Sequence, residues 1–469
     1  MNTSTRSRAA RRIGSLPLIA ILAGLFAAQT PAARSADPSP IVIKVLVLDY
    51  DPKFGGQLLH EVFHWSDPRS LAKGYIEDME KAAGGQLKIE IVEWRDLDEI
   101  YAREDGGRFT VEEYVRNRKA GAGWPEKIVA DYPRIMAGQK VAPMIDDGRV
   151  DEVWVFSDHF FGLWEASMAG PGAFFINGGV YPEVPSKRPF AFYGFSYERG
   201  VAEMMHNTSH RAESTMNRIY GQWNLGNPRN NWEKFSANNS QSNGVAGVGT
   251  CHWPANAMSD YDYGNGREVE SWADDFLNYP NLTGKTRKVS VNTWSGPGRD
   301  HHRDYMKWYF THLPKAAGVN PDGKLNNWWR YLYEFANYTK TGQPLPPSAA
   351  VIRLDSSPTG AGIAIAYRSA AGIVPETFDP ADVSLQSGQD PVINPASVAA
   401  SDSRPGGYRV ATYRFPAMKA GQLAGCTVRL HPNQVKDLAG SALMPAEWNV
   451  VETSGALEAR PVPNTPRDK

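Results

Sequence analysis

The alternation of apolar and polar positions divides the chain into regions with different periods. Between residues 41 and 341, apolar runs of strand length alternate with segments of helical period. The run from Ile41 to Tyr50 is nearly all apolar, which is typical of a strand buried on both faces of a parallel sheet. A helical pattern at Leu71–Ala83 and a second strand at Leu87–Trp94 follow it. This β-α-β order predicts an α/β fold with a layered, mostly parallel sheet and flanking helices.

The same two periods predict the other elements of this region. Helices are expected at Val111–Arg118, Pro125–Met136, Arg267–Asn278, Asp300–Leu313 and Leu325–Tyr338, and around the stretch Glu203–Glu213. Strands are expected at Val150–Phe156, Phe190–Phe195 and Lys288–Trp294. Residues 221–266 are rich in Asn, Gly and Ser and show no clear period, but their three Trp residues indicate an ordered segment that forms a wall of the site.

The pattern changes beyond residue 341. Residues 342–349 begin with Gly342-Gln343-Pro344-Leu345-Pro346-Pro347, which predicts a stiff linker. Residues 350–453 then show short alternating strands, such as Gly362–Tyr367, Tyr408–Phe415 and Thr427–Leu430, separated by Gly and Pro turns. This pattern predicts a small all-β sandwich. Residues 454–469 are expected to form a flexible tail.

Three motifs in this C-terminal part carry a family resemblance. They are Phe378-Asp379-Pro380-Ala381-Asp382-Val383, Ala424-Gly425-Cys426-Thr427-Val428 and Val435-Lys436-Asp437-Leu438-Ala439-Gly440. In these residues the region resembles the S-layer-type bacterial Ig-like domain, departing from it at Cys426. The resemblance implies a spacer or adhesion module. The α/β region is similar to exported bacterial proteins of unassigned function, which implies no site residues.

The N-terminal residues 1–36 have the pattern of a secretory signal peptide. Four arginines precede an apolar stretch from Ile13 to Ala28, and small residues follow up to Ala36. The Arg11-Arg12 pair leaves the twin-arginine route open beside the general secretory route. We therefore expect an exported protein, periplasmic, cell-surface or extracellular, with no integral membrane span after signal removal.

Composition narrows the range of partners. The net charge is −1, so no electrostatic attraction to nucleic acid is expected. The two cysteines, Cys251 and Cys426, fall in different predicted domains, so we expect no disulfide framework. A Cys251 nucleophile with His252 as its base is one reading of that adjacent pair. The oligomeric state is left open by the sequence.

One stripe of a predicted helix carries the strongest candidate chemistry. Glu203, His206, His210 and Glu213 follow at spacings of three, four and three residues, which returns them to one side of a helix. A His pair at i, i+4 beside carboxylates is how a helix presents ligands to a divalent metal, with zinc the first choice. In this interpretation His206 and His210 bind the metal, Glu213 or His301 completes the site, and Glu203 is the general base. A solvated helix face or a buried polar network is the alternative.

Other candidates lie elsewhere in the α/β region. His60, Glu61 and His64 fit the H-E-x-x-H pattern, which on a helix presents two zinc ligands and a general base. An ordinary amphipathic turn is the alternative. Asp158 ends a predicted strand, at the sheet edge where sites of α/β proteins gather.

These features lead to three hypotheses about function. The first is an exported metal-dependent hydrolase, in particular a peptidase, with an Ig-like accessory domain. The second is a metal-free glycoside hydrolase with an aromatic cleft and two carboxylates. The third is a non-enzymatic surface protein that binds glycan or protein. An extracellular peptide or glycan is accordingly the expected substrate or ligand.

Overall fold

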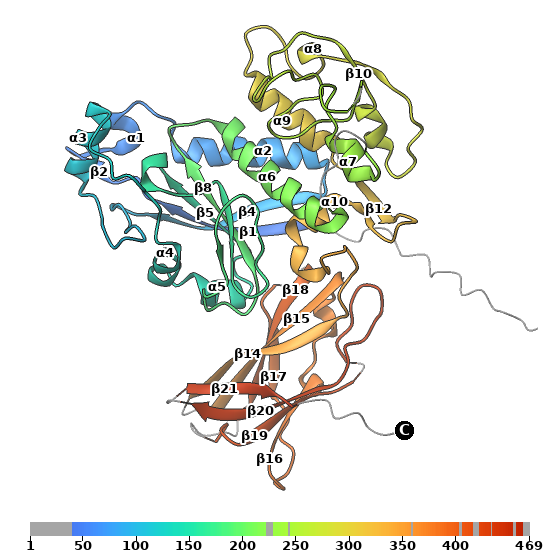
Figure 1. Cartoon of the computed structure of the whole chain (residues 1–469). Helices are drawn as coiled ribbons and strands as arrows, with labels where there is room; N and C mark the ends of the chain where they lie inside the picture. Colours follow the sequence, from blue (N-terminus) through green and yellow to red (C-terminus); the bar gives the residue numbers. More distant parts are fainter. Residues whose placement is uncertain are drawn as a thin grey trace, which may run out of the picture. The chain divides into compact units, whose positions relative to one another are not determined.

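The computed structural model describes most of the chain beyond the expected signal peptide. The described residues are 40–221, 228–242, 244–357, 360–402, 406–415, 422–432, 434–453 and 456–462. Residues 1–36, and with them the expected signal peptide, lie outside this set. Within it, the chain has mixed α and β content, with one mainly parallel sheet and several antiparallel ones (Figure 1).

A six-stranded sheet organises the first region. Its order is β4-β1-β5-β8-β6-β7, and the pairs β1–β4, β1–β5 and β5–β8 are parallel, whereas β6 runs antiparallel to β8. The strands are β1 (Ile41–Asp49), β4 (Leu87–Asp96), β5 (Glu152–Ser157), β6 (Ala166–Ala169), β7 (Val180–Tyr181) and β8 (Phe190–Ser196). The mainly parallel sheet predicted from the apolar runs is thereby confirmed.

Both faces of this sheet are covered, which explains the continuous apolar run of β1. Val45 and Val47 belong to an apolar cluster with residues of α2 (Pro68–Ala83) and α6 (Val201–Tyr220). Leu46 and Leu48, which point the other way, belong to a cluster with residues of α3 (Val111–Ala120), α4 (Tyr132–Gly138) and α5 (Val141–Asp146). Successive residues of a strand face opposite sides, so both sets must be apolar.

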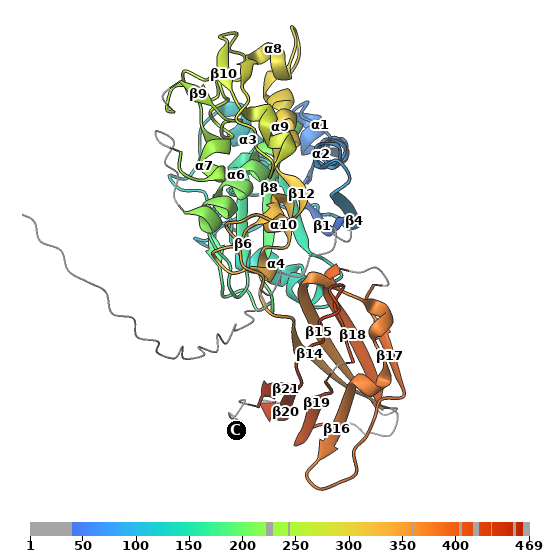
Figure 2. The same ribbon diagram turned by 90° about the vertical axis from the view of Figure 1, so that its right-hand side faces the viewer.

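Local hydrogen bonds and backbone conformation define the ends of α2 and the start of α6. Asp67 caps α2 by accepting hydrogen bonds from the main-chain N–H groups of Arg69 and Ser70, and Gly84 ends it in the left-handed conformation at φ 58°. The helix α6 begins after Gly200, whose N–H donates to Glu203. A third helix, α9 (His301–His312), lies beside both of them (Figures 1 and 2).

Short elements connect α6 to α9 and follow it. They are α7 (Asn231–Ser236), β9 (Val245–Ala246), β10 (Val269–Ser271), a 3₁₀ turn (Ala273–Asn278), β11 (Arg287–Val289), α8 (Val291–Trp294), β12 (Lys315–Val319), β13 (Leu325–Asn327), α10 (Trp328–Tyr333) and a 3₁₀ turn (Phe335–Asn337). Three sequence expectations are corrected here. The expected helix Arg267–Asn278 is a strand and a 3₁₀ turn, the expected strand Lys288–Trp294 is mostly β11 and α8, and the expected helix Leu325–Tyr338 is β13, α10 and a 3₁₀ turn. β10 forms because it pairs with β9 and β11, a partnership that local periodicity does not reveal.

Eight strands from the described part of residues 348–461 form two four-stranded antiparallel sheets. One has the order β14-β15-β18-β17 and the other β16-β19-β20-β21. Their bounds are β14 (Ser348–Ser357), β15 (Gly360–Ile373), β16 (Val383–Ser387), β17 (Ser397–Ala400), β18 (Gly406–Phe415), β19 (Cys426–Leu430), β20 (Ala446–Thr453) and β21 (Ala456–Pro461). The expected flexible tail from residue 454 is corrected in part, because Ala456–Pro461 pairs with β20.

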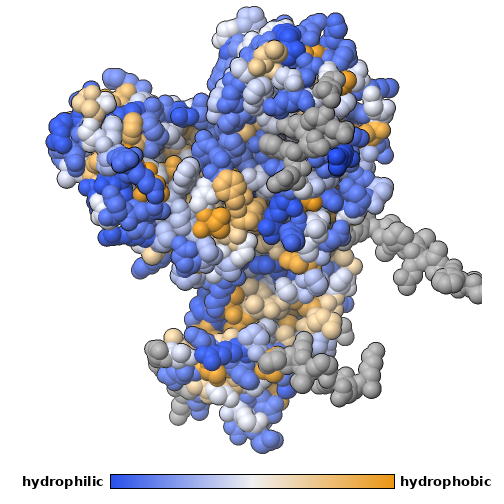
Figure 3. All heavy atoms as spheres, viewed as in Figure 1, coloured by the Kyte–Doolittle hydropathy of each residue, from blue (hydrophilic) through white to orange (hydrophobic). Residues whose placement is uncertain are grey.

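The two antiparallel sheets share one apolar cluster, to which Ile365 and Tyr413 contribute from one sheet and Val428 and Trp448 from the other. The face of the molecule in Figure 3 is largely hydrophilic, with apolar side chains in small groups. Among the described residues, no helix combines the length and apolar character needed to cross a membrane.

Candidate metal centre

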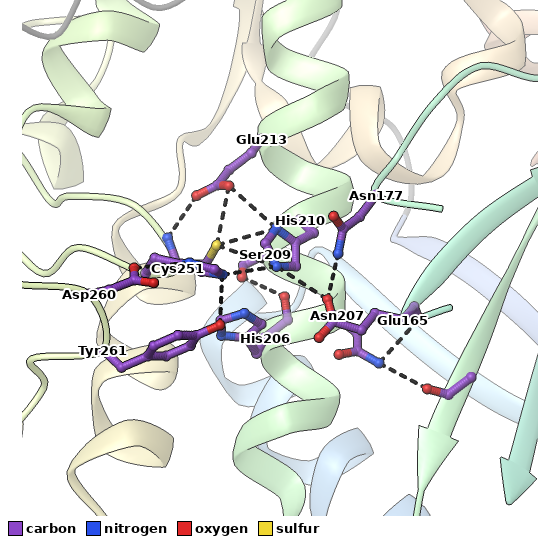
Figure 4. A network of polar contacts seen from close by, with 12 residues as sticks. Glu165, Asn177, His206, Asn207, Ser209, His210, Glu213, Cys251, Asp260 and Tyr261 are labelled. Carbon is purple, nitrogen blue, oxygen red and sulfur yellow. Dashed lines mark hydrogen bonds and ion pairs between the residues drawn. The ribbon is translucent and has the colours of Figure 1, made fainter. Parts of the chain in front are cut away.

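Three imidazoles gather where α6 meets the segment after β9. Helix α6 contributes His206 and His210, whose ring centroids are 4.7 Å apart. The irregular segment contributes His252, whose ring lies 4.9 Å from that of His206 and 5.1 Å from that of His210. One ligand atom from each of these residues and from Cys251 lies within 4.8 Å of the others. Figure 4 shows His206, His210 and Cys251 beside one another. The group is a candidate metal centre by residue type and spacing.

Cys251 and Glu213 are the neighbours of Nδ1 of His210. Nδ1 lies 3.4 Å from Sγ of Cys251 and 3.7 Å from Oε2 of Glu213. Nε2, on the other edge, lies 3.3 Å from Nε2 of His252 and 3.3 Å from Oε2 of Glu165. A carboxylate behind Nδ1 leaves Nε2 free to bind a cation, as in carboxylate–histidine–metal triads.

His252 has the same arrangement. Its Nδ1 lies 3.1 Å from Oδ1 of Asp260. Its Nε2 points toward Nε2 of His210 and lies 3.3 Å from the hydroxyl of Tyr261. A carboxylate therefore supports this imidazole from behind as well.

The third imidazole, His206, is supported by another histidine. Its Nδ1 lies 3.2 Å from Nε2 of His302, and Nδ1 of His302 lies 3.6 Å from Oε1 of Glu203. The ring of His302 is fixed by stacking on Tyr263, with centroids 4.3 Å apart. The relay Glu203–His302–His206 leaves Nε2 of His206 as its ligand atom.

Glu165 stands beside the imidazoles on a more open side. It precedes β6, and its side chain is 42% exposed, against 15% for His210. Asn177 donates to its Oε2. Asn207, on α6 between the two histidines, donates to the main-chain carbonyls of Glu165 and Gly194 at 3.1 Å each (Figure 4). These bonds fix the main chain that carries Glu165 to α6.

Local electrostatics act differently on the histidines: against the effect of burial, Glu213 and then Glu165 raise the pKa of His210 above its ordinary value. Burial, with the neighbouring His210, His302 and His252, lowers the pKa of His206 to about 2. Burial and then Glu213 raise the pKa of the Cys251 thiol well above its ordinary value. That thiol donates to Oε2 of Glu213 at 3.2 Å. His206 is thus an acceptor with an unprotonated nitrogen, whereas Cys251 keeps its proton.

The spacing between the Nε2 atoms of His210 and His252 fits a tetrahedral ion. Zinc–nitrogen distances of about 2.0–2.1 Å place neighbouring ligand nitrogens roughly 3.3 Å apart. Nε2 of His210 has two neighbours at 3.3 Å, Nε2 of His252 and Oε2 of Glu165. Sγ of Cys251 lies beside the same ring, 3.4 Å from Nδ1 of His210 and 3.9 Å from its Nε2.

The structure distributes the sequence candidates on helix α6 over two roles. His206 and His210 lie in the cluster, as the helical stripe suggested. Glu213 lies behind His210, and its Oε1 also accepts the main-chain N–H of Cys251 at 2.7 Å. Glu203 faces His302 and the helix N-terminus. The arrangement makes both glutamates supports for the imidazoles.

Some site residues were missed by the sequence reasoning. His302 faces His206, whereas the candidate His301 makes a contact of 2.9 Å with Oγ of Ser295. From the sequence alone, His252 has only the role of a base for a Cys251 nucleophile, and Glu165 is assigned no part in a metal site. The one usable signal was the Trp-rich irregular segment, which was expected to form a wall of the site and does supply His252.

The H-E-x-x-H interpretation is contradicted by the local backbone. Helix α1 (Leu59–Val62) follows β3 (Gln57–Leu58), which pairs with β2 (Lys53–Phe54), and it has only four residues. His64 lies beyond the helix in the left-handed conformation, at φ 56°, and is exposed. The Nδ1 of His60 contacts Oδ2 of Asp51, and Glu61 accepts the N–H of Leu58 at 3.0 Å. The two histidines therefore share no helical face.

Asp158 belongs to a separate ion network at the carboxyl edge of the sheet. It is fully buried, and burial raises its pKa to about 6. Against the effect of burial, hydrogen bonds with Asp158, His159 and Arg118 hold the pKa of Glu198 at about 2. Nη2 of Arg118 and Nδ1 of His159 lie 2.7 and 2.8 Å from Oε2 of Glu198. A guanidinium in contact with the carboxylates disfavours a metal ion there, and a buried Asp158 is out of reach of a substrate.

Comparisons with protein-family models, with curated proteins and with solved structures find no match. The site is therefore interpreted from its own geometry. Its imidazoles, its supporting acids and the exposed Glu165 are the observations on which the function depends.

Proposed function

We propose that this protein is a metal-dependent hydrolase whose divalent ion, zinc by first choice, is bound by Nε2 of His206, His210 and His252. One observation carries the proposal: each imidazole has an acid or another histidine near its Nδ1, at 3.7 Å for His210, 3.1 Å for His252 and 3.2 Å for His206. Such partners orient metal-binding histidines and fix their tautomer. A solvated helix face has no need of three imidazoles that gather in one place and each have a second side chain beside them.

The ligand set favours a catalytic ion over a structural one. Structural zinc sites are closed by four protein ligands, commonly with several thiolates, whereas catalytic sites combine three protein ligands with a water. Here the nearest thiol, Cys251, keeps its proton and donates it in a hydrogen bond to Glu213. The fourth position is then left to water on the side of Glu165.

The residues support a simple division of labour. The ion supplies Lewis acidity and a more acidic bound water. Glu165 accepts the proton of the attacking water and returns it to the leaving group, the role of a general base and then acid. A peptide amide is the substrate class that we propose. We further propose export from the cell, and an accessory Ig-like sandwich formed by the sheets of residues 350–453.

Metal analysis of the purified protein tests the ion. We expect one tightly held equivalent in the wild type, and its loss in His252→Ala. His301→Ala is the matched control, because this neighbouring histidine contacts Ser295 instead. Metal binding that survives His252→Ala, or that is lost in His301→Ala, contradicts the ligand assignment.

A second variant separates the base from the ligands. Glu165→Gln keeps the shape and the contact with Asn177 but cannot take a proton. We expect full metal content and a fall in peptide hydrolysis of about 10²–10⁴-fold. Loss of the metal would make Glu165 a ligand, and unchanged hydrolysis would remove it from the mechanism.

A further inference from the structure

Tyr261 covers the metal centre from the solvent side. The residue is 53% exposed, although its ring packs on two of the imidazoles. The ring centroid lies 4.5 Å from that of His252 and 5.8 Å from that of His206, at 22° to the latter (Figure 4). The hydroxyl lies 3.3 Å from Nε2 of His252. A ring with this exposure contributes little burial, so its position calls for another explanation.

The main chain at Tyr261 adopts a costly conformation to hold the ring there. Its φ of 59° lies in the left-handed region, which bulky residues rarely enter. The N–H of Tyr261 donates to the carbonyl of His252 at 2.9 Å, and its own carbonyl accepts from Tyr263 at 2.9 Å. The segment from His252 to Tyr263 thus closes on itself and presents the phenol to the centre.

The phenol of Tyr261 and the carboxylate of Glu165 contact different imidazoles of the centre. Glu165 contacts Nε2 of His210, whereas the Tyr261 hydroxyl contacts Nε2 of His252. A carboxylate at the centre accepts protons, and a phenol donates a hydrogen bond. The two groups supply opposite functions, as hydrolysis of a carbonyl compound requires.

We propose that Tyr261 is a catalytic residue whose O–H donates a hydrogen bond to the carbonyl oxygen of the substrate as that oxygen becomes negative. This inference rests on the proposed hydrolase function. Water oxygen bonds to the carbonyl carbon, the C=O π pair moves onto the oxygen, and Glu165 takes the water proton. The C=O bond then re-forms, the C–N bond breaks, and the proton passes from Glu165 to the leaving nitrogen. Tyr261 keeps its own proton throughout.

The test uses full-length protein loaded with Co²⁺, titrated with acetohydroxamate and followed by the visible spectrum of the ion. The hydroxamate carries an anionic oxygen when it binds. The Tyr261 hydroxyl is expected to donate a hydrogen bond to that oxygen. Tyr261→Phe is expected to keep its cobalt and to bind the hydroxamate about tenfold more weakly, or worse. For peptide hydrolysis we expect kcat to fall by about 10²–10³-fold, with little change in KM.

Two further variants separate this role from a structural one. Tyr261→Gly removes the phenol and the strained φ together, so it is expected to melt at a higher temperature and to lose the same hydroxamate affinity. Tyr279→Phe is the control, because its hydroxyl contacts Asn231 and Asn320 outside the centre. It is expected to bind the hydroxamate as the wild type does.

The outcomes that overturn the inference are distinct from those that overturn the hydrolase. Unchanged hydroxamate affinity and kcat in Tyr261→Phe contradict a catalytic phenol. A tyrosinate charge-transfer band in the Cu²⁺-loaded wild type, absent from Tyr261→Phe, makes Tyr261 a ligand instead. A wild type that holds no metal, or that holds it without hydrolysing peptides, contradicts the proposed function itself.

Discussion

Single residues behind the imidazoles determine what this site can bind. The Nε2 atoms of His210 and His252 lie 3.3 Å apart. Their Nδ1 atoms each lie near an acid, Glu213 for His210 and Asp260 for His252. Without those acids the rings would be free to rotate and to change tautomer. The supporting residues therefore belong to the function as much as the ligands do.

Removal of one supporting acid tests this directly. Asp260→Ala leaves every proposed ligand in place but frees Nδ1 of His252. We expect metal affinity to fall by about 10–100-fold, the usual effect of losing such a partner. Competition with a chromophoric chelator measures the change. Affinity equal to that of the wild type would show that Asp260 does not orient His252.

A buried acid far from the imidazoles sets a pH dependence of stability. Burial, then Asp51 and Asp96, raise the pKa of Asp49 to about 8. In the unfolded chain the pKa of an aspartate is about 3.9. The folded state thus holds this proton more tightly, and its contribution to stability, fully present below pH 4, is lost as the pH rises toward 8. The slope is up to about 1.4 kcal/mol for each pH unit.

Asp49→Asn removes this slope, because an amide does not titrate. We expect the melting temperature of the variant, relative to the wild type, to rise between pH 5 and pH 8. Thermal unfolding at a series of pH values checks it. A constant difference across that range would show that Asp49 ionises normally in the folded protein.

At the scale of elements, α6 is positioned by a buried ion pair. Arg211, on the helix, contacts Glu152 of β5, and both side chains are 3% exposed. Arg211 also donates to the hydroxyl of Tyr193 on β8 at 3.1 Å. The pair ties the helix that carries His206 and His210 to the centre of the sheet.

Breaking this ion pair is expected to lower the free energy of unfolding. Arg211→Met leaves the carboxylate of Glu152 buried without its cation, and we expect a loss of about 3–5 kcal/mol in the free energy of unfolding. The double variant Arg211→Met/Glu152→Gln is expected to recover part of that loss. Urea unfolding of the variants measures both effects. A single variant within 1 kcal/mol of the wild type, about the effect of an exposed pair, would contradict the buried-pair interpretation.

The long elements could be predicted from sequence because each contains enough residues for its apolar period to be recognised. β1, β4, β5, β8, α2, α6 and α9 all appear close to their expected positions. Short elements such as β10 and α8 depend on partners far along the chain. They contain too few residues for an apolar period to be recognised. The helical half of the site, His206 and His210, followed from spacing. His252 and Glu165 lie in irregular segments, which only the tertiary fold brings to α6.

At the scale of the whole molecule, the apolar core is divided into distinct clusters. The clusters around the six-stranded sheet and the cluster of the two antiparallel sheets hold different residues. We expect a chain ending at residue 346 to fold and to bind one metal ion with the affinity of the full chain. Circular dichroism and metal titration check this. A truncated chain that is unfolded would show that the C-terminal sheets are needed for the fold of the first region.

X-ray absorption at the zinc edge of the loaded wild-type protein tests the central claim most directly. The three-histidine site predicts only nitrogen and oxygen neighbours at about 2.0–2.2 Å, with the outer-shell scattering of imidazole rings. A sulfur neighbour at about 2.3 Å would place Cys251 on the ion and make the site a closed, structural one. A spectrum without imidazole scattering would contradict the site altogether.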